Sequence, residues 1–271
     1  MAADGGPARG PALTALVSAV RAALRAAADP ERGRGMQTYL KSTQPCIGVR
    51  MPEVRRLTRT AATEHPPASV GAVERAAGEL WRAATYREER YAATALTGLP
   101  VADGALDLLP LHTEMIVTGA WWDLVDGVSP RVRALLLAQP GAMTPVLRDW
   151  ARSPDRWLRR SAVIAQVGAK DRTDTELLAE VIEVNAADPE FFVRKAIGWA
   201  LRDLAKTDPA WVRRFLAEHE LSPLSRRGSQ APRRRTSWRH RLSPPRRVVL
   251  CPPWWAEHER PGGHSLRTPV L

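Results

Sequence analysis

Apolar side chains recur at helical spacing along most of the chain. In the stretch ALTALVSAVRAALRAAA, apolar residues at 13, 16, 17, 20 and 24 share one face of a helix. The same spacing, interrupted by breaks such as Ser129-Pro130, predicts further helices at 36–42, 51–64, 69–83, 86–98, 103–117, 119–126, 130–138, 141–152, 155–168, 173–186, 189–206 and 208–219. No alternating pattern typical of a strand occurs before residue 245. The pattern therefore predicts an all-α protein.

The predicted helices come in pairs that recur about every 35 to 45 residues. The segment PGAMTPVLRDWARSPDRWLRRSAVIAQVG, residues 140–168, has the pattern of one complete helix–turn–helix unit. Repeated helix pairs stack on their neighbours into an α-solenoid, and one helix of each pair lines the surface that usually binds the partner. We therefore expect residues 11–227 to form one domain, an α-solenoid of HEAT-like helical repeats (an α-α superhelix).

The two ends of the chain differ from this body in composition. Residues 1–10 are rich in Gly, Ala and Pro, and we expect them to be disordered. Residues 228–271 are rich in Arg, Pro, Ser and Trp without a helical stripe; they are either a disordered basic tail that binds nucleic acid nonspecifically or a GC-rich gene read in a shifted frame. Residues 226–271 hold +9 of the net charge of +11, so the bulk charge does not argue that the body binds DNA.

Composition also excludes several classes of protein. No window holds eighteen consecutive apolar residues, and the N-terminus lacks the pattern of a secretory signal, so we expect no membrane span or export. The two cysteines, Cys46 and Cys251, lie far apart, which favours a reducing cytoplasm over a disulfide framework. The six histidines show no ligand spacing, and we expect no metal site.

Four stretches mix aromatic and charged residues at helical spacing: WWDLVD (121–126), DRWLRRSAVIAQ (155–166), EFFVRKAIGWALRDLAKT (190–207) and YLKSTQPCIGVRMPEVRRL (39–57). Trp122 and Asp126 share a helix face, and Lys195, Trp199 and Arg202 follow one another turn by turn. A groove that holds a phosphate backbone favours such interleaving. Each residue taken alone has a simpler interpretation: the tryptophans, Trp121 above all, as core, Asp126 as part of a helix end, and Arg160 as a solvated or ion-paired arginine.

In these stretches the chain resembles the AlkD-like DNA alkylation repair proteins, which are helical-repeat DNA glycosylases. The resemblance covers roughly residues 15–227, with several motifs in the same order. It implies that the second tryptophan of the WWD motif, Trp122, and the aspartate four residues later, Asp126, are catalytic, together with Trp199 of KAIGW. It further implies DNA-binding roles for Arg160 of WLRR and for Tyr39. We add Lys195 and Arg202 as candidate DNA contacts from their positions beside Trp199.

The resemblance implies an enzyme that excises cationic alkylated purines, such as 3-methyladenine and 7-methylguanine, from duplex DNA without flipping the base. Asp126 would stabilise the oxocarbenium ion, Trp122 and Trp199 would flank the sugar, and Arg160 would hold a phosphate. No cofactor is required, and we expect a monomeric bacterial cytoplasmic protein, associated with the nucleoid when bound to DNA. The alternatives are a noncatalytic helical-repeat module that binds damaged or branched DNA, and a scaffold for protein interactions.

The chain departs from the family near its C-terminal end. The family continues after PLS with a helix that begins R-E-A, whereas this chain continues RRGSQAP. We therefore expect the closing helix of the last repeat to be missing. Its absence would leave an exposed apolar face around Val212, Phe215 and Leu216, and would reduce stability or solubility.

Overall fold

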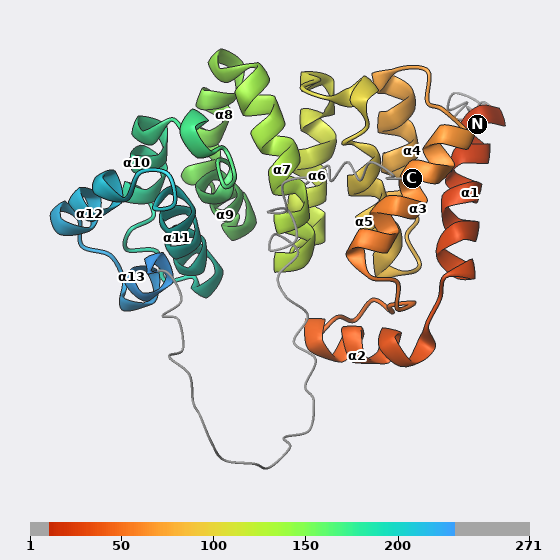
Figure 1. The fold of residues 1–271 in the computed structure, drawn as a ribbon, viewed down its shortest axis with the longest axis horizontal. Helices are drawn as coiled ribbons and strands as arrows, with labels where there is room; N and C mark the ends of the chain where they lie inside the picture. Colours follow the sequence, from red (N-terminus) through yellow and green to blue (C-terminus); the bar gives the residue numbers. More distant parts are fainter. Residues whose placement is uncertain (1–10, 231–271) are drawn as a thin grey trace, which may run out of the picture. The chain divides into compact units, whose positions relative to one another are not determined.

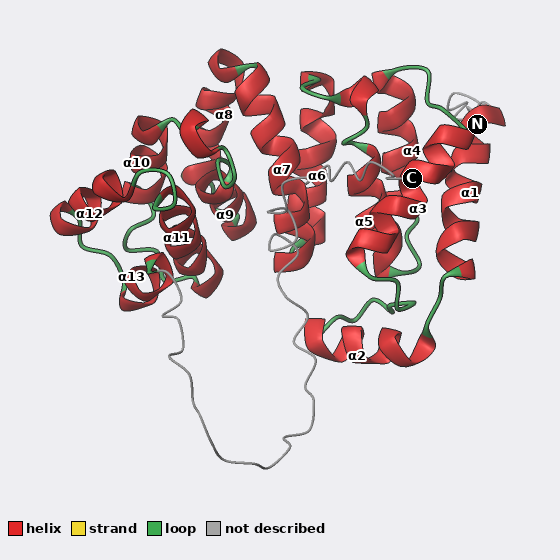
Figure 2. Cartoon of the chain, in the orientation of Figure 1, coloured by secondary structure: helices red, strands yellow, loops and turns green. Residues whose placement is uncertain are grey.

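The structure, a computed structural model, describes residues 11–230, and every regular element in that range is a helix (Figures 1 and 2). The all-α prediction is confirmed. The α-helices are α1 (Pro11–Ala26), α2 (Pro30–Leu40), α3 (Met51–Glu64), α4 (Val70–Arg82), α5 (Arg87–Leu96), α6 (Leu109–Gly119), α7 (Trp122–Ala138), α8 (Pro140–Ala151), α9 (Arg156–Ile164), α10 (Thr175–Glu183), α11 (Phe191–Leu204), α12 (Pro209–Glu218) and α13 (Pro223–Ser229). Three short 3-10 helices are η1 (Pro100–Ala102), η2 (Leu106–Leu108) and η3 (Lys170–Arg172).

The helices stack in two layers, as expected for an α-solenoid. One layer runs α3, α5, α7, α9, α11, α13, each helix contacting the next, and the paired helices α4, α6, α8 and α12 pack against α5, α7, α9 and α11. Polar contacts between equivalent positions of neighbouring repeats reinforce the stack, such as Arg82 with Glu114 and Arg148 with Glu180, each pair 32 residues apart. Buried apolar side chains from Leu16 to Leu221 form one continuous core between the layers.

The predicted helix break at Ser129-Pro130 is wrong. We expected two helices separated at Ser129-Pro130, but α7 runs unbroken from Trp122 to Ala138 with Pro130 inside it. The helix persists because its neighbours support it: the Ser129 hydroxyl donates to the Ile164 carbonyl of α9 at 2.9 Å, and Val128 and Val132 are fully buried. Packing thus outweighs the local cost of proline, which has no N–H to offer the carbonyl of Asp126 one turn earlier.

The C-terminal end corrects a second expectation. Val212 and Phe215 of α12 are each only 4% exposed, so the predicted exposed apolar face is wrong for both, and Leu216 is half-buried. Phe215 stacks between Trp211 and His219, and the His219 ring bonds Glu183 at the end of α10 at 3.0 Å. The apolar face of α12 is therefore packed into the core, which includes both Val212 and Phe215, and α12 contacts α11.

A short closing helix is also present. The sequence PLSRRGS forms α13, and the glycines Gly198 of α11 and Gly228 of α13 let the two backbones approach closely. The Ser225 hydroxyl donates to the Arg194 carbonyl at 3.0 Å. Helical structure therefore extends to Ser229, beyond the boundary we placed at residue 227. The expectations for residues 1–10 and for residues 231–271 lie outside the described residues.

Among residues 11–230, no helix combines the length and apolar character needed to cross a membrane.

Candidate active site

The candidate site centres on an ion pair between α7 and α9. The Arg160 guanidinium donates from Nε to Asp126 Oδ1 at 2.8 Å and from Nη2 to Oδ2 at 2.7 Å. Both side chains are almost fully buried, 6% and 7% exposed respectively. A paired, bidentate geometry of this kind fixes both groups in position and satisfies the charges that burial would otherwise make costly.

Arg160 also connects the pair to α11. Its Nη1 donates to the Phe192 carbonyl at 2.6 Å, and its guanidinium carbon lies 6.0 Å from the centroid of the Trp199 ring, within cation–π range. The structure thus brings together Asp126, Arg160 and Trp199 from three successive helices of one layer. In this arrangement the guanidinium is directed at Asp126, and its predicted contact with a DNA phosphate stays a prediction.

Trp122 and Tyr39 form a second part of the site. Their rings meet edge to face with centroids 6.2 Å apart, although they come from α7 and α2. Tyr39 is 57% exposed and Trp122 is half-buried, so both present ring surface to an incoming ligand. The neighbouring Trp121 packs on the core as expected, against Trp157 and Phe192, and its indole N–H donates to the Leu40 carbonyl at 2.7 Å.

The local sequence explains why α7 starts where it does. Ala120 ends α6 with a left-handed backbone (φ 42°), and Trp121 is extended, so the helix begins at Trp122. This start places Trp122 in the first turn and Asp126 one turn later on the same face, as the spacing predicted.

Burial dominates the electrostatics of the site. It raises the pKa of Asp126, while the adjacent Arg160 opposes that rise by favouring the charged form. Asp123 on the same helix raises the pKa of Asp126 further, and Lys195 of α11 lowers it. The result is a desolvated carboxylate with one cation as its close partner, in surroundings where charge interactions are strong.

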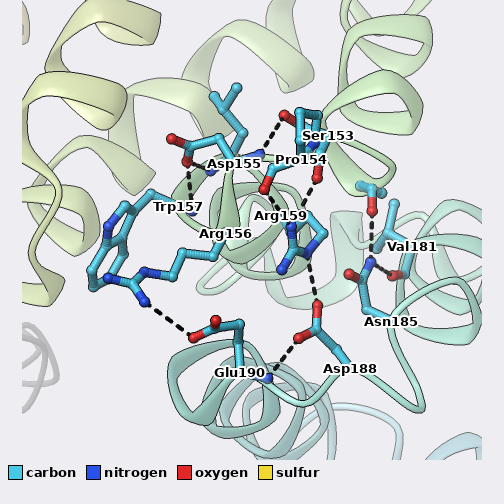
Figure 3. Close-up of polar contacts among 12 residues, drawn as sticks. Ser153, Pro154, Asp155, Arg156, Trp157, Arg159, Val181, Asn185, Asp188 and Glu190 are labelled. Carbon is cyan, nitrogen blue, oxygen red and sulfur yellow. Dashed lines mark hydrogen bonds and ion pairs between the residues drawn. The ribbon is translucent and has the colours of Figure 1, made fainter.

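Helix α9 is fixed at its N-terminal end by polar contacts to the α10–α11 connection (Figure 3). Asp155 caps α9 by accepting from the Trp157 and Leu158 amides at 2.7 and 3.1 Å. Arg159 pairs with Asp188 at 2.7 Å, and Arg156 with Glu190 at 3.3 Å. These contacts hold the start of α9 in register with the start of α11 and so help to place Arg160 against the Phe192 carbonyl.

The remaining predicted DNA contacts lie along α11. Lys195 is exposed, with Nζ 5.4 Å from the Phe191 ring centroid. Arg202 is half-buried and donates to the Gly228 carbonyl of α13 at 3.1 Å. Lys195 is therefore available to a ligand near the Asp126–Arg160 pair, whereas Arg202 helps to attach α13. Neither contact with DNA is tested by the structure.

Sequence reasoning missed a second buried ion pair beside the first. Arg87 of α5 donates to both oxygens of Asp123 at 2.7 and 2.6 Å, and the Tyr91 hydroxyl donates to the same carboxylate. The signal was an acidic residue three positions before Asp126, but its partners stand more than thirty positions earlier. Phe191, which is 49% exposed at the start of α11, was also missed, because neighbouring Phe192 fitted the helical stripe.

Within residues 11–230, no group of three or more His, Cys, Asp or Glu side chains is arranged to hold a metal ion.

The fold and this cluster define a helical-repeat protein with a buried carboxylate–guanidinium pair among aromatic rings. The sequence matches the family of DNA alkylation repair enzymes over residues 20–230, and the chain belongs to that family. It is similar to a solved structure described as a predicted DNA alkylation repair enzyme from Enterococcus faecalis, with 26% identity and a TM-score of 0.62, over 77% of this chain and 98% of that chain. No protein of curated function matches the chain. A role in DNA alkylation repair follows from the family.

Proposed function

We propose that the protein is a DNA glycosylase that hydrolyses the N-glycosidic bond of cationic alkylated purines, such as 3-methyladenine and 7-methylguanine, in duplex DNA without base flipping. The observation that carries the proposal is the buried Asp126 carboxylate, held by Arg160 beside the rings of Trp122 and Trp199. A chain that only binds DNA has no need of a desolvated carboxylate close to a polyanion.

The residue types suit the chemistry of such a lesion. An alkylated purine that carries a positive charge departs as a neutral base, so no general acid is needed. Positive charge then develops on the deoxyribose, and the fixed carboxylate of Asp126 stabilises it and orients the attacking water. The faces of Trp122 and Trp199 add cation–π stabilisation. Because Arg160 holds both oxygens of Asp126, the carboxylate needs little reorganisation as the bond breaks.

The N-terminal ends of α7 and α11 carry backbone N–H groups that suit a phosphate backbone. The starts of α7 and α11 both lie at the Asp126–Arg160 pair, since Arg160 contacts Asp126 and the Phe192 carbonyl. Among the described residues, no side chain caps either helix start. Their backbone N–H groups and the positive ends of the helix dipoles favour an anion, and exposed Lys195 adds a charge nearby. We propose that double-stranded DNA with alkylated bases binds here to a monomer.

The test is the release of free 7-methylguanine from alkylated duplex DNA by the purified protein. We expect Asp126→Asn to reduce the single-turnover rate by about 100-fold or more, since a charge that acts on the transition state is lost. Glu180→Gln is a matched control, because it neutralises an acid that also holds an arginine at both oxygens but lies exposed, 43%, on α10, which packs against α8 and α9. The control variant keeps the wild-type rate.

A noncatalytic module that binds damaged or branched DNA is the second candidate. The observation in its favour is that both oxygens of Asp126 are already bonded to Arg160 and the residue is 5% exposed, as in a purely structural pair. This candidate predicts that the wild-type protein binds alkylated DNA without releasing a base. It also predicts that a folded Asp126→Asn variant binds DNA as tightly as the wild type or more tightly, because one negative charge is removed.

A further inference from the structure

The second buried ion pair joins two segments that carry site residues. Arg87 is the first residue of α5, and its side chain and that of Asp123 are only 6% and 8% exposed. Its Nε and Nη2 hold the Asp123 carboxylate, while Nη1 donates to the Ser42 hydroxyl at 3.0 Å. Ser42 lies three residues after Tyr39, and Asp123 directly follows Trp122. One guanidinium therefore links the segment after Tyr39 to the first turn of α7.

Further contacts support the same junction. The Arg87 amide donates to the Pro45 carbonyl at 2.9 Å, so the start of α5 holds the α2–α3 connection through backbone and side chain alike. The Trp121 indole donates to the Leu40 carbonyl, one residue beyond Tyr39. Tyr91, 6% exposed, donates its hydroxyl to the Asp123 carboxylate from one turn further along α5. Movement of Asp123 would therefore disturb the edge-to-face contact between Tyr39 and Trp122.

We propose that Arg87, Asp123 and Tyr91 form a positioning cluster for the reaction: they fix the first turn of α7, with Trp122 and Asp126, relative to Tyr39. The inference rests on the proposed glycosylase function for its kinetic consequence. It assigns a role to a carboxylate that the Asp126–Arg160 pair does not use. The cluster acts through Trp122 and Asp126, and itself touches neither DNA nor the reacting sugar.

The cluster also influences the charge of Asp126. The charged groups that face Asp126 are Arg160 from α9, Lys195 from α11 and Asp123 from its own helix, and Asp123 acts to raise the pKa of Asp126. Arg87 partly cancels that effect, because it neutralises Asp123. Arg87→Met therefore raises the pKa of Asp126. In a plot of the base-release rate against pH, the limb on the acid side then moves to higher pH. Asp123→Asn removes the negative charge and moves the limb to lower pH.

These opposite shifts distinguish positioning by charge from a merely structural role. The experiment measures single-turnover base release against pH, DNA affinity and melting temperature for wild type, Arg87→Met, Arg87→Lys and Asp123→Asn. Arg148→Met is the matched control, because Arg148 holds Glu180 at both oxygens, at 2.6 and 2.9 Å, but this pair is exposed and joins α8 to α10, which carry none of the site residues.

We expect Arg87→Met to lower the rate by about 10- to 100-fold, as small misplacements of reacting groups do, with DNA affinity within about twofold. Arg87→Lys restores part of the rate because it keeps the charge without the bidentate fork. The control keeps the wild-type rate and profile. If Arg87→Met does not fold, the test rests on Arg87→Lys and Asp123→Asn. The inference is overturned if the folded variants keep the wild-type rate. It is also overturned if the acid limbs of their pH–rate profiles stay in place or all move in the same direction. Either result leaves the glycosylase proposal intact.

A measurement independent of activity separates the two proposals. In a protein labelled with ¹⁵N at its tryptophan side chains, we expect the Arg87 and Asp123 variants to shift the indole N–H peaks of Trp121 and Trp122. The Trp211 peak, from α12, stays in place, and Arg148→Met moves neither site peak. If the wild type releases no base, the proposed function fails, but these peaks still decide whether the cluster positions the site; unmoved peaks overturn it.

Discussion

Replacing Arg160 by methionine is expected to destabilise the protein strongly, because it leaves the Asp126 carboxylate buried without its partner. Loss of one member of a buried pair costs about 3–5 kcal/mol in free energy of unfolding. The lost bond to the Phe192 carbonyl, 2.6 Å in the structure, adds about 1 kcal/mol. For a domain of this size, the loss of about 3–5 kcal/mol from breaking the ion pair corresponds to a fall in Tm of about 6–20 °C.

The matching variant Asp126→Leu leaves the Arg160 cation unpaired and is expected to be destabilised by a similar amount. In the double variant Asp126→Leu/Arg160→Met no charge is buried, and apolar pairs of similar volume replace buried ion pairs at little cost. We therefore expect the double variant to be more stable than either single variant, yet inactive. Lowering the pH reduces the defect of Arg160→Met alone, since protonation of Asp126 removes the unpaired charge.

Urea unfolding followed by circular dichroism at pH 7 and pH 5 gives the four free energies of the double-mutant cycle, and base release gives the activities. A double variant whose loss equals the sum of the single losses would refute the reasoning, because the two side chains would then act independently. Equal loss for Arg160→Met at both pH values would show that Asp126 is not the charge left behind.

Three further variants test other parts of the structure. His112 is buried, neither of its ring nitrogens is bonded among the described residues, and burial lowers its pKa from 6.5 to about 4. Because the unfolded chain binds the proton more readily, the free energy of unfolding falls by about 3 kcal/mol as the pH drops from 6.5 to 4. We expect His112→Leu to remove this loss, measured by unfolding at a series of acidic pH values. Gly198→Ala would place a Cβ 2.8 Å from Gly228 Cα, and we expect increased proteolysis of α13 without loss of the central fold. Lys195→Gln is expected to weaken DNA binding and to reduce the slope of log affinity against log salt by about 1, measured by fluorescence anisotropy; an unchanged slope argues against a phosphate contact.

The sequence predicted the elements that rest on local pattern. Helix α3 has the predicted bounds, Met51–Glu64, and the spacing of Trp122 and Asp126 correctly placed both on one face of α7. Helix α2 begins earlier than expected, at Pro30, because Asp29 caps it by accepting from the Arg32 amide at 2.9 Å. Local rules failed at Pro130, where contacts with α9 support a helix that proline alone would end.

What the sequence did not predict depends on partners distant in the chain. Arg160 was expected to hold a phosphate, and nothing in WLRR indicates that its guanidinium N–H groups are bonded to Asp126 and to the Phe192 carbonyl. Asp123 was visible as an acid three positions before Asp126, but its partner Arg87 stands 36 residues away and could not be inferred from the local pattern. The packing of α12 involves the stack of Phe215 with His219, whose ring bonds Glu183, 36 residues earlier in the chain. The periodicity of the sequence identifies the buried face of a helix, but not the side chains from other helices that contact this face.

The polar links between neighbouring helices have a mechanical consequence. Asp126 with Arg160, Arg87 with Asp123, and Arg148 with Glu180 each join residues 32 to 36 positions apart, so each of these links attaches one helix pair to the next pair in the stack. A stack of this kind loosens from its outer pairs inward, each step costing only one interface. The central helices α7 and α9 have neighbours on both sides, so we expect their amide hydrogens to exchange last with heavy water. The proposed chemistry therefore sits in the part of the stack that opens most rarely.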